Sequence, residues 1–575
     1  MQIRQLKIKN FRGIASMTWT PRDAFCCLIG AGDSGKSTIL DAAEAALNSR
    51  WFSFSESDFL TCDTSNTIEI EVTVGELSRA LKSDERFGLY IRGWKSEGEL
   101  RDEPEGDDEP VLTVRLSVDA TLEPVWELVC DRVENPRTIS NRDRAMFGLV
   151  RLAGDDARHL AWGQGSVLSR LTGDNKEAAA RLAEAYRAAR DSAKLDEIES
   201  LAQTATAAQG FAKGLGAYVE GHYEPGLELG RSGLSSGSIA LHDDGVPLRL
   251  AGLGTRRLAT LAIQKSAIAE GAIILVDEIE HGLEPHRIIG AISQLKSSQG
   301  MAAASGSPVG QVLLTTHSDI ALAECGARSL HVIKTSRPER ETTARKTEAP
   351  LPIAALMRFT PRALFARRVL VCEGMTEVGL LLGMREQWPQ RHQGKPIEQL
   401  GVALADGNGA EAPAMALALA GLGYPTALFM DSDVPLPPPT LASLAAAGVH
   451  IYEYGNFLNT EQAIFTAATD QKVQELLTIA RANHGEESVN GCLFPRIAGF
   501  THLNVREEFK TWELNCALDG TQLRRIVAEA AKTKKWFKEQ RYGREIGPTV
   551  WSVVCEDHAS PLTRTLLDLE AWCYA

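Results

Sequence analysis

The chain has 575 residues, of which 44% are hydrophobic and 24% are charged, and its net charge is −14. A domain usually has ~100–200 residues, so two to four domains are expected. An acidic chain is not a general nucleic-acid binder, because affinity for DNA comes largely from Lys and Arg; a local basic groove or bound metal ions would still permit DNA binding. The first residues lack an apolar signal core, no run of ~18 apolar residues occurs, and the ten cysteines are scattered. We therefore expect a reduced, cytoplasmic protein without membrane contact.

Strand-like segments dominate the first part of the chain, where we expect residues 3–8, 17–19, 25–29, 67–74, 111–118 and 124–133 to be strands. The acidic stretch 97–109 is predicted to be a solvated loop. The stretch 173–215, rich in Ala, Glu, Arg and Lys, predicts one or two long helices that form an insertion.

Short apolar segments, typical of a parallel sheet buried on both faces, follow at residues 271–276, 312–316, 329–334, 369–372, 401–405 and 426–430. Between the third and fourth of these, residues 335–352 are charged and contain proline. This stretch is predicted to be a linker or the end of a domain.

A phosphate-binding loop is predicted between the strand at 25–29 and a helix over 36–47. Residues 30–37 match the pattern G-x-x-x-x-G-K-[ST] in full. Glycines let backbone N–H groups wrap the phosphates, and the helix N-terminus adds partial positive charge. Lys36 is expected to reach the β- and γ-phosphates, and Ser37 to hold Mg²⁺. The residues expected to bind ATP and its Mg²⁺ are Gly30, Gly32, Asp33, Ser34, Gly35, Lys36, Ser37, Thr38 and Asp277.

Two acids follow the apolar strand that ends at residue 276. Asp277 is expected to orient Mg²⁺ and Glu278 to polarise the attacking water. Strand-Asp-Glu is a common pattern, but two later features strengthen the prediction. Residues 280–285 are similar to the D-loop of ABC-type ATPases, and the strand at 313–316 ends in His317. A His at a strand end is usually structural; in this order we expect His317 to sense the γ-phosphate.

Residues 250–258 resemble the ABC signature loop, which caps ATP bound to the opposite subunit. The usual Ser-Gly-Gly core is not intact, so Gly252, Gly254 and Arg256 all remain candidates for the contact in trans. Residues 57–59 lie roughly where a Q-loop would. The wide separation of the two halves resembles the split head of structural-maintenance and RecF-like ATPases, although no long coiled coil is present.

Acids end three successive strands in the second half of the chain. Glu373 follows the first, Asp406 the second, and Asp431 and Asp433 the third. Carboxyl ends of neighbouring parallel strands converge on one crevice. Acids on one strand would merely face solvent, but several acids gathered together repel one another until a divalent cation binds. Oxygen ligands favour Mg²⁺ or Mn²⁺.

The order Glu-Gly, Asp and Asp-x-Asp resembles the Toprim domain of topoisomerases, primases and some nucleases. An ABC-type ATPase followed by Toprim resembles the OLD (overcoming lysogenization defect) nucleases, which include the nuclease subunit of Gabija-type anti-phage systems. The resemblance implies an α/β chain with an ABC-type (SMC/RecF-like) P-loop ATPase head, a helical insertion and a Toprim α/β domain. The expected divisions are 1–165 and 226–350 for the ATPase, 166–225 for an insertion that is a candidate dimerisation element, and 351–575 for Toprim.

The resemblance also implies an ATP-regulated DNA endonuclease with a two-metal site, acting in anti-phage defence. It adds Glu461 as a later acidic ligand and a catalytic Lys among Lys534, Lys535 and Lys538; a basic helix face that only contacts phosphates is the alternative. The implied metal ligands are Glu373, Glu377, Asp406, Asp431, Asp433, Glu461, Ser37 and Asp277. The implied catalytic residues are Glu373, Asp431, Asp433, Lys535, Lys538, Glu278 and His317. The implied partners are DNA, further copies of the chain in a dimer or tetramer, and a helicase-like or other defence protein.

Other functions fit the sequence less well. A nucleotide-switched DNA-binding scaffold of RecF/SMC type would have an inactive Toprim fold, whereas the acids are intact. A topoisomerase or primase needs a Tyr-bearing cleavage domain or a polymerising site, and neither is legible. ABC transporters do not carry Toprim domains.

Overall fold

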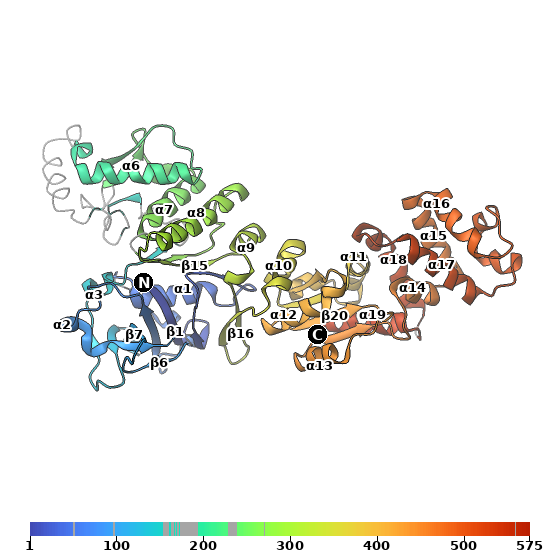
Figure 1. The fold of residues 1–575 in the computed structure, drawn as a ribbon, viewed down its shortest axis with the longest axis horizontal. Helices are drawn as coiled ribbons and strands as arrows, with labels where there is room; N and C mark the ends of the chain where they lie inside the picture. Colours follow the sequence, from blue (N-terminus) through green and yellow to red (C-terminus); the bar gives the residue numbers. More distant parts are fainter. Residues whose placement is uncertain are drawn as a thin grey trace. The chain divides into compact units, whose positions relative to one another are not determined.

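The computed structural model describes residues 1–49, 52–95, 98–152, 160–162, 166, 168, 172, 194–227, 239–268, 271–557 and 559–575 (Figure 1). The chain divides into two compact units, Met1–Lys346 and Thr347–Ala575. No helix in these ranges has the length and apolar character needed to cross a lipid bilayer. Long helices are predicted over 173–215. Residues 173–193 lie outside the described residues, and the remaining part, 194–215, contains the helix α6 (Glu199–Gly214).

A mixed sheet forms the centre of the first unit. In the described part of the chain its strand order is β10-β14-β15-β3-β16-β17-β2-β1-β4-β7-β5-β6, with β8 and β9 continuing from β7. The strands from β10 to β16 in this order are parallel, and the run from β2 to β7 is antiparallel. The bounds are β1 (Gln2–Phe11), β2 (Ile14–Trp19), β3 (Phe25–Ile29), β4 (Ile68–Gly75), β5 (Arg92–Trp94), β6 (Leu100–Arg101), β7 (Glu109–Val118), β8 (Pro124–Val129), β9 (Arg137–Thr138), β10 (Leu149–Leu152), β14 (Ile273–Val276), β15 (Gln311–Thr315), β16 (Leu330–Thr335) and β17 (Glu341–Lys346).

Helices and a small sheet accompany these strands. The helix α1 follows β3 through the glycine-rich loop, and most of its Ala and Leu side chains are buried against the sheet. The helix α8 starts with a proline, whose fixed φ suits the first helical turn. The bounds are α1 (Lys36–Leu47), α2 (Asp84–Phe87), α3 (Asn141–Ala145), α7 (Leu253–Ile268), α8 (Pro285–Ala304), α9 (Asp319–Cys325), β11 (Tyr223–Leu227), β12 (Ile239–Asp243) and β13 (Val246–Pro247).

The stretch 335–352 is predicted to be a linker or the end of a domain. The first unit does end within it, at Lys346, but the first half of the stretch is not a linker. There, β17 lies between β16 and β2 and pairs with both. Its side chains are mostly exposed and charged, so its composition is that of a loop. Backbone hydrogen bonds from two neighbouring strands nevertheless hold it in the sheet, and composition does not reveal such partners.

The second unit contains a parallel sheet with the order β19-β18-β20-β21. The sheet carries α10 to α13 and α19, and helices α14 to α18 form a further group (Figure 1). The strands are β18 (Arg368–Cys372), β19 (Val402–Asp406), β20 (Thr426–Met430) and β21 (His450–Glu453). The helices are α10 (Pro350–Phe359), α11 (Met375–Met384), α12 (Ala412–Gly421), α13 (Pro438–Ala446), α14 (Thr460–Ala467), α15 (Asp470–His484), α16 (Glu486–Leu493), α17 (Gly520–Lys534), α18 (Gln540–Glu556) and α19 (Pro561–Tyr574).

Four glycines bring α11 and α18 into close backbone contact. A Cβ added to Gly383 would lie 2.3 Å from the Arg544 carbonyl oxygen, and Gly547 packs against Gly383 in turn. Gly379 and Gly543 repeat this arrangement one turn away. The contact fixes the helix that follows Glu373 against the helix that follows the lysine-rich segment 532–538.

We expect Gly383→Ala to lower the free energy of unfolding of the second unit by about 1–3 kcal/mol, because a methyl group has no room between these backbones. Denaturant titration measures the change. Gly491→Ala in α16 is the matched control, since a Cβ there meets nothing within 4 Å; the better helix propensity of Ala predicts equal or slightly higher stability. Equal stability of Gly383→Ala and the natural protein would contradict the close contact.

Candidate functional site

The loop between β3 and α1 is shaped to surround phosphates. Asp33 and Gly35 have positive φ angles of 58° and 91°. Gly30 cannot carry a side chain, because a Cβ would lie 2.4 Å from the Ile333 carbonyl oxygen. Lys36 Nζ donates to the carbonyl oxygens of Gly30 at 3.1 Å and Ala31 at 2.9 Å. Burial lowers the pKa of Lys36 to about 8. The same loop and the first turn of α1 contain Gly32, Ser34, Ser37 and Thr38.

Asp277 lies at the end of β14, facing this loop. Its Oδ1 accepts hydrogen bonds from Ser37 Oγ at 3.1 Å and from Thr315 Oγ1 at 2.6 Å, while its Oδ2 pairs with Arg151 Nη2 at 2.8 Å. Arg151 is 2% exposed and also pairs with Asp41 at 2.8 Å. The structure thus brings the predicted Mg²⁺ ligands Ser37 and Asp277 together. Thr315 and Arg151 carry no motif, so sequence reasoning missed them.

Glu278 and His317 lie on the same side of the loop. Glu278 has a left-handed φ of 46° and a half-exposed side chain. The backbone N–H of His317 donates to Glu280 Oε1 at 2.6 Å, and Thr316 Oγ1 donates to the other oxygen. Burial, and then the charge of Lys36, lower the pKa of His317. A neutral imidazole is therefore favoured beside the phosphate loop, and it can donate or accept one hydrogen bond.

The structure at the start of α7 distinguishes the three residues of the predicted signature loop that are candidates for the contact in trans. Gly252 is exposed before the helix, whereas a Cβ on Gly254 would lie 2.7 Å from the Gly282 carbonyl oxygen in the same chain. Arg256 is half-buried. The next residue, Arg257, is buried and donates to the carbonyl oxygens of Asp277 at 2.5 Å and Glu278 at 3.0 Å. Arg257 therefore braces the turn that carries the two acids, a role that the sequence did not suggest.

The segment 57–59 is tied to the phosphate loop through Arg12. Arg12 Nε donates to Asp58 Oδ1 at 3.0 Å, and its Nη1 pairs with Asp41 on α1 at 2.5 Å. Asp41 in turn contacts Arg151. A chain of ion pairs therefore connects this segment with Asp277.

Acids gather at the carboxyl edge of the second sheet. Glu373 Oε2 accepts a hydrogen bond from the backbone N–H of Asp431 at 3.1 Å. The carboxyl groups of Asp431 and Asp433 interact, and the interaction raises the pKa of Asp431 and lowers that of Asp433. Asp406 ends the neighbouring strand and is buried. The parallel order β19-β18-β20 thus brings the acids of three separate strands together.

Crowding and burial change the acidity of these groups. Burial, with the charge of Glu373, raises the pKa of Asp431 to about 8. Partial burial opposes ionisation of Asp433, but the hydrogen bond from Lys532 outweighs it and the pKa of Asp433 is lowered. Burial raises the pKa of Glu377 to about 7 and also raises that of Glu461. A divalent cation would relieve the penalty of ionising these groups together.

The two glutamates differ in their contacts. Glu377 accepts from the Gly374 backbone N–H at 3.1 Å and from Thr460 Oγ1 at 2.7 Å, so both of its oxygens have partners. Glu461 is 2% exposed, and its Oε1 has no hydrogen-bond partner among the described residues. Glu461 therefore fits a cation ligand, whereas Glu377 braces the turn after β18 against α14.

Lysines complete this edge of the sheet. Lys532 Nζ pairs with Asp433 Oδ2 at 2.6 Å. The charge of Lys538 adds to the lowering of the pKa of Asp433 and offsets part of the rise that burial causes in the pKa of Glu377 and Glu461. The helix α17 ends at Lys534, and Lys535 turns the chain with a φ of 57° and an exposed side chain. In the described residues, the lysines that act on the acids are thus Lys532 and Lys538. Lys532 was missed because the sequence does not show where the helix ends.

A separate triad brings Asp23, Cys26 and His331 ligand atoms within 4.8 Å of one another, more closely than any three of the described acids at the sheet edge. Trp19 Nε1 donates to His331 Nδ1 at 3.3 Å, and Lys346 pairs with Asp23 at 2.5 Å. The indole N–H occupies the lone pair on Nδ1, so the neutral ring carries its proton on Nε2 and cannot bind a cation there. We interpret this triad as a structural contact.

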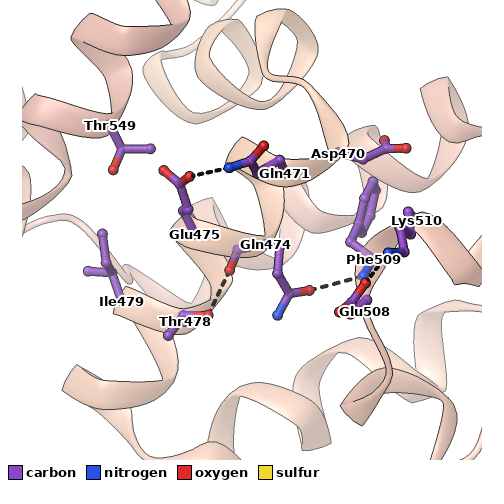
Figure 2. A pocket seen from close by; sticks show the side chains of 10 residues that line it. All are labelled: Asp470, Gln471, Gln474, Glu475, Thr478, Ile479, Glu508, Phe509, Lys510 and Thr549. Atoms are coloured by element: carbon purple, nitrogen blue, oxygen red, sulfur yellow. Dashed lines mark hydrogen bonds and ion pairs between the residues drawn. The ribbon is translucent and has the colours of Figure 1, made fainter.

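A cavity of about 690 Å³ lies between α15, the turn at 508–510 and α18 (Figure 2). Glu475 pairs with Lys472 at 3.0 Å, and Glu508 pairs with Lys510 at 2.5 Å. Gln474 Oε1 accepts from the backbone N–H of Phe509 at 3.0 Å. None of the ten lining residues is a predicted site residue, and these two acids are neutralised by neighbouring lysines.

Three family models match the chain. One described as "Overcoming lysogenization defect protein-like, TOPRIM domain" matches residues 364–433, which contain Glu373, Asp431 and Asp433. The "AAA ATPase domain" matches residues 1–92, and "AAA domain, putative AbiEii toxin, Type IV TA system" matches residues 172–323. The chain is thus an ATPase followed by a Toprim domain. The combination fits the OLD family, and its two domain types indicate an ATP-dependent nuclease.

Solved structures of SMC heads are also similar. The Smc head bound to the C-winged helix domain of ScpA is 16% identical, with 60% of this chain and 98% of that chain covered and a TM-score of 0.36. The Smc head with an extended coiled coil, bound to the C-terminal domain of ScpA derived from Pyrococcus furiosus, is 14% identical over 60% of this chain and 96% of that chain, with a TM-score of 0.36. The SMC head domain from Thermotoga maritima is 16% identical over 61% and 100%, with a TM-score of 0.30. No curated protein matches the sequence.

The predicted fold class is confirmed. The first unit has the mixed sheet and phosphate loop of an ATPase head, and the second has the parallel sheet of a Toprim domain.

Proposed function

We propose that the chain is an ATP-regulated DNA endonuclease whose Toprim site uses divalent cations, Mg²⁺ or Mn²⁺. The observation that carries the proposal is the crowding of carboxyl groups at the edge of the second sheet. Asp431 has a pKa raised to about 8, and Glu461 keeps a buried oxygen without a partner in the described structure. Structural acids at a solvent edge would have neither property.

The proposed ligands of the cations are Glu373, Asp406, Asp431, Asp433 and Glu461. Hydrogen bonds among the described residues hold both carboxyl oxygens of Glu377, but at most one oxygen of each of these five acids. Bound cations would stabilise the negative charge that develops on a phosphodiester under attack. Lys538 is exposed beside these acids, so we propose that it contacts the scissile phosphate. Lys532 is held by Asp433, so it positions that carboxylate and neutralises part of its charge.

The first unit supplies the proposed ATP site. ATP would lie on the loop around Lys36, with Mg²⁺ held by Ser37 and Asp277, Glu278 polarising water and His317 facing the γ-phosphate. The nearby Arg151 pairs with Asp277 and must share it with the cation. We propose that ATP controls cutting through this unit. A role in anti-phage defence, with a helicase-like or other defence protein as partner, is the further proposal that the OLD resemblance suggests.

A plasmid assay tests this function. Supercoiled DNA is incubated with the protein and Mg²⁺ or Mn²⁺, with and without ATP. Nicked or linear products that disappear with EDTA are expected. If the DNA stays intact under every condition, the nuclease proposal is wrong and a DNA-binding scaffold with an inactive Toprim fold takes its place.

We expect the protein to be at least a dimer. An ABC-type head completes its ATP site with the signature loop of a second head, and the exposed Gly252 before α7 is available for such a contact. Light scattering with and without ATP measures the mass in solution. A monomer under both conditions would contradict the proposed ATP site in trans.

A further inference from the structure

A cavity of about 640 Å³ borders the phosphate loop on the side away from Asp277. It is lined by Asp33 of the loop, Gly13 of the β1–β2 turn, and Thr335, Arg337, Pro338 and Arg340 at the β16–β17 turn. Its volume is in the range of roughly 300–1,000 Å³ that is usual for small-ligand sites. A Cβ added to Gly13 would meet nothing within 4 Å, so the cavity is open beside this turn.

The order of the strands sets the direction in which a nucleotide must lie. The phosphate loop follows β3, which has β15 and β14 on one side and β16 and β17 on the other. Asp277 and His317, the groups expected at the γ-phosphate and Mg²⁺, follow β14 and β15. A linear triphosphate whose γ-end faces that side has its nucleoside end on the opposite side. The cavity at the end of β16 lies there.

The β16–β17 turn is fastened to the phosphate loop. Thr335 Oγ1 donates to the Ser34 carbonyl oxygen at 3.0 Å, and Ala15 on β2 donates to the Arg340 carbonyl oxygen at 2.9 Å. Within the turn, the Arg340 N–H donates to the Ser336 carbonyl oxygen at 3.1 Å. The backbone is therefore held, while the side chains of Arg337 and Arg340 are exposed and form no ion pair with any described residue.

We infer that this cavity holds the nucleoside part of ATP, with Arg337 and Arg340 as its wall. A guanidinium group stacks on the face of a nucleobase, and two arginines without acidic partners on a fixed turn are suited to such a contact. The inference rests on the proposed ATP binding and adds the residues that recognise the base end of the ligand. The inference also assigns a role to β17, because its pairing with β16 holds the turn that carries both arginines.

The experiment compares ATP, in the form of a non-hydrolysable analogue, with inorganic triphosphate, which lacks a nucleoside, by calorimetry in the presence of Mg²⁺. Arg337→Ala and Arg340→Ala should each weaken ATP binding by about 2–30-fold, the range expected for loss of one cation–π contact. The affinity for inorganic triphosphate should not change. Arg345→Ala removes an exposed arginine of β17 that does not line the cavity, and it should bind both ligands as the natural protein does.

Three results would overturn the inference. Natural ATP affinity in the variant with both arginines replaced means that the nucleoside lies elsewhere. Equal losses for ATP and for triphosphate mean that the arginines act on phosphates. Binding of neither ligand by the natural protein refutes the proposed ATP site as well, and so separates that failure from failure of the inference alone. Unchanged melting temperatures of the variants confirm that each of them is folded.

Discussion

Lys36→Ala should lower ATP hydrolysis by about 100–1,000-fold while the melting temperature stays near that of the natural protein. The Lys36 ammonium lies inside the phosphate loop, bonded to the carbonyl oxygens of Gly30 and Ala31. The Lys36 ammonium is expected to stabilise the negative charge of the β- and γ-phosphates. Removal of one preorganised hydrogen-bond donor to a developing charge typically lowers the reaction rate by about 100–1,000-fold. Release of inorganic phosphate measures the effect.

Lys82→Ala is the control for this change. Lys82 is exposed in the same unit and lies outside the phosphate loop, so hydrolysis should be unchanged. If Lys36→Ala hydrolyses ATP at the natural rate, the loop is not the nucleotide site. The same variant also tests regulation: DNA cleavage that no longer responds to ATP would support control through the first unit.

Glu373→Ala or Asp431→Ala should lower DNA cleavage by more than about 100-fold and leave ATP hydrolysis intact. Glu373 Oε2 and the backbone of Asp431 are in direct contact, so each carboxyl group helps to form the proposed cation site. Loss of a bound cation removes several kcal/mol of stabilisation of the transition state, and each 1.36 kcal/mol is a factor of about ten in rate. Quantified nicking of supercoiled plasmid in Mg²⁺ or Mn²⁺ is the measurement.

Glu453→Ala provides a matched control, because Glu453 also ends a strand of this sheet but is exposed on β21, outside the cluster. It should cut DNA as the natural protein does. Natural cleavage by Glu373→Ala would instead place the nuclease centre elsewhere or reveal a contaminating activity. Loss of both ATP hydrolysis and cleavage in the Glu373 variant would indicate a folding defect, which its melting temperature would reveal.

The features predictable from sequence were those whose signal is local. The phosphate loop is a contiguous pattern, and the acids at the ends of β18, β19 and β20 each directly follow an apolar run. Arg151 and Thr315 escaped notice because they reach Asp277 only when β10 and β15 pair with β14. Lys532 escaped because its partner, Asp433, follows a strand that is distant in sequence, and because the end of α17 is not marked by a glycine or proline.

Of the two interpretations of residues 335–352, the end of a domain agrees with the unit boundary at Lys346, and the linker was wrong for a related reason. The composition of a segment indicates whether its side chains can be buried, but it does not indicate which other strands will form backbone hydrogen bonds with that segment. The segment of β17 has few apolar residues, yet its main chain pairs with β16 along most of its length and with β2 at its start. The interpretation of Glu377 was limited in the same way: its position in the motif suggests a ligand, whereas only the fold reveals that Gly374 and Thr460 already use its oxygens.

The glycine crossing of α11 and α18 also sets the order in which the second unit can be completed. The helix α11 ends at Met384, whereas its partner α18 begins only at Gln540. Contacts between segments so far apart in sequence form slowly, because the entropy of closing a long loop is lost before the contacts stabilise the fold. During synthesis, the acids of β18 to β20 emerge long before α18 and before Lys532 and Lys538. A chain interrupted before α18 would have the carboxylates without the helix that anchors the lysine segment, so the proposed nuclease centre can assemble only after α18 has been synthesised.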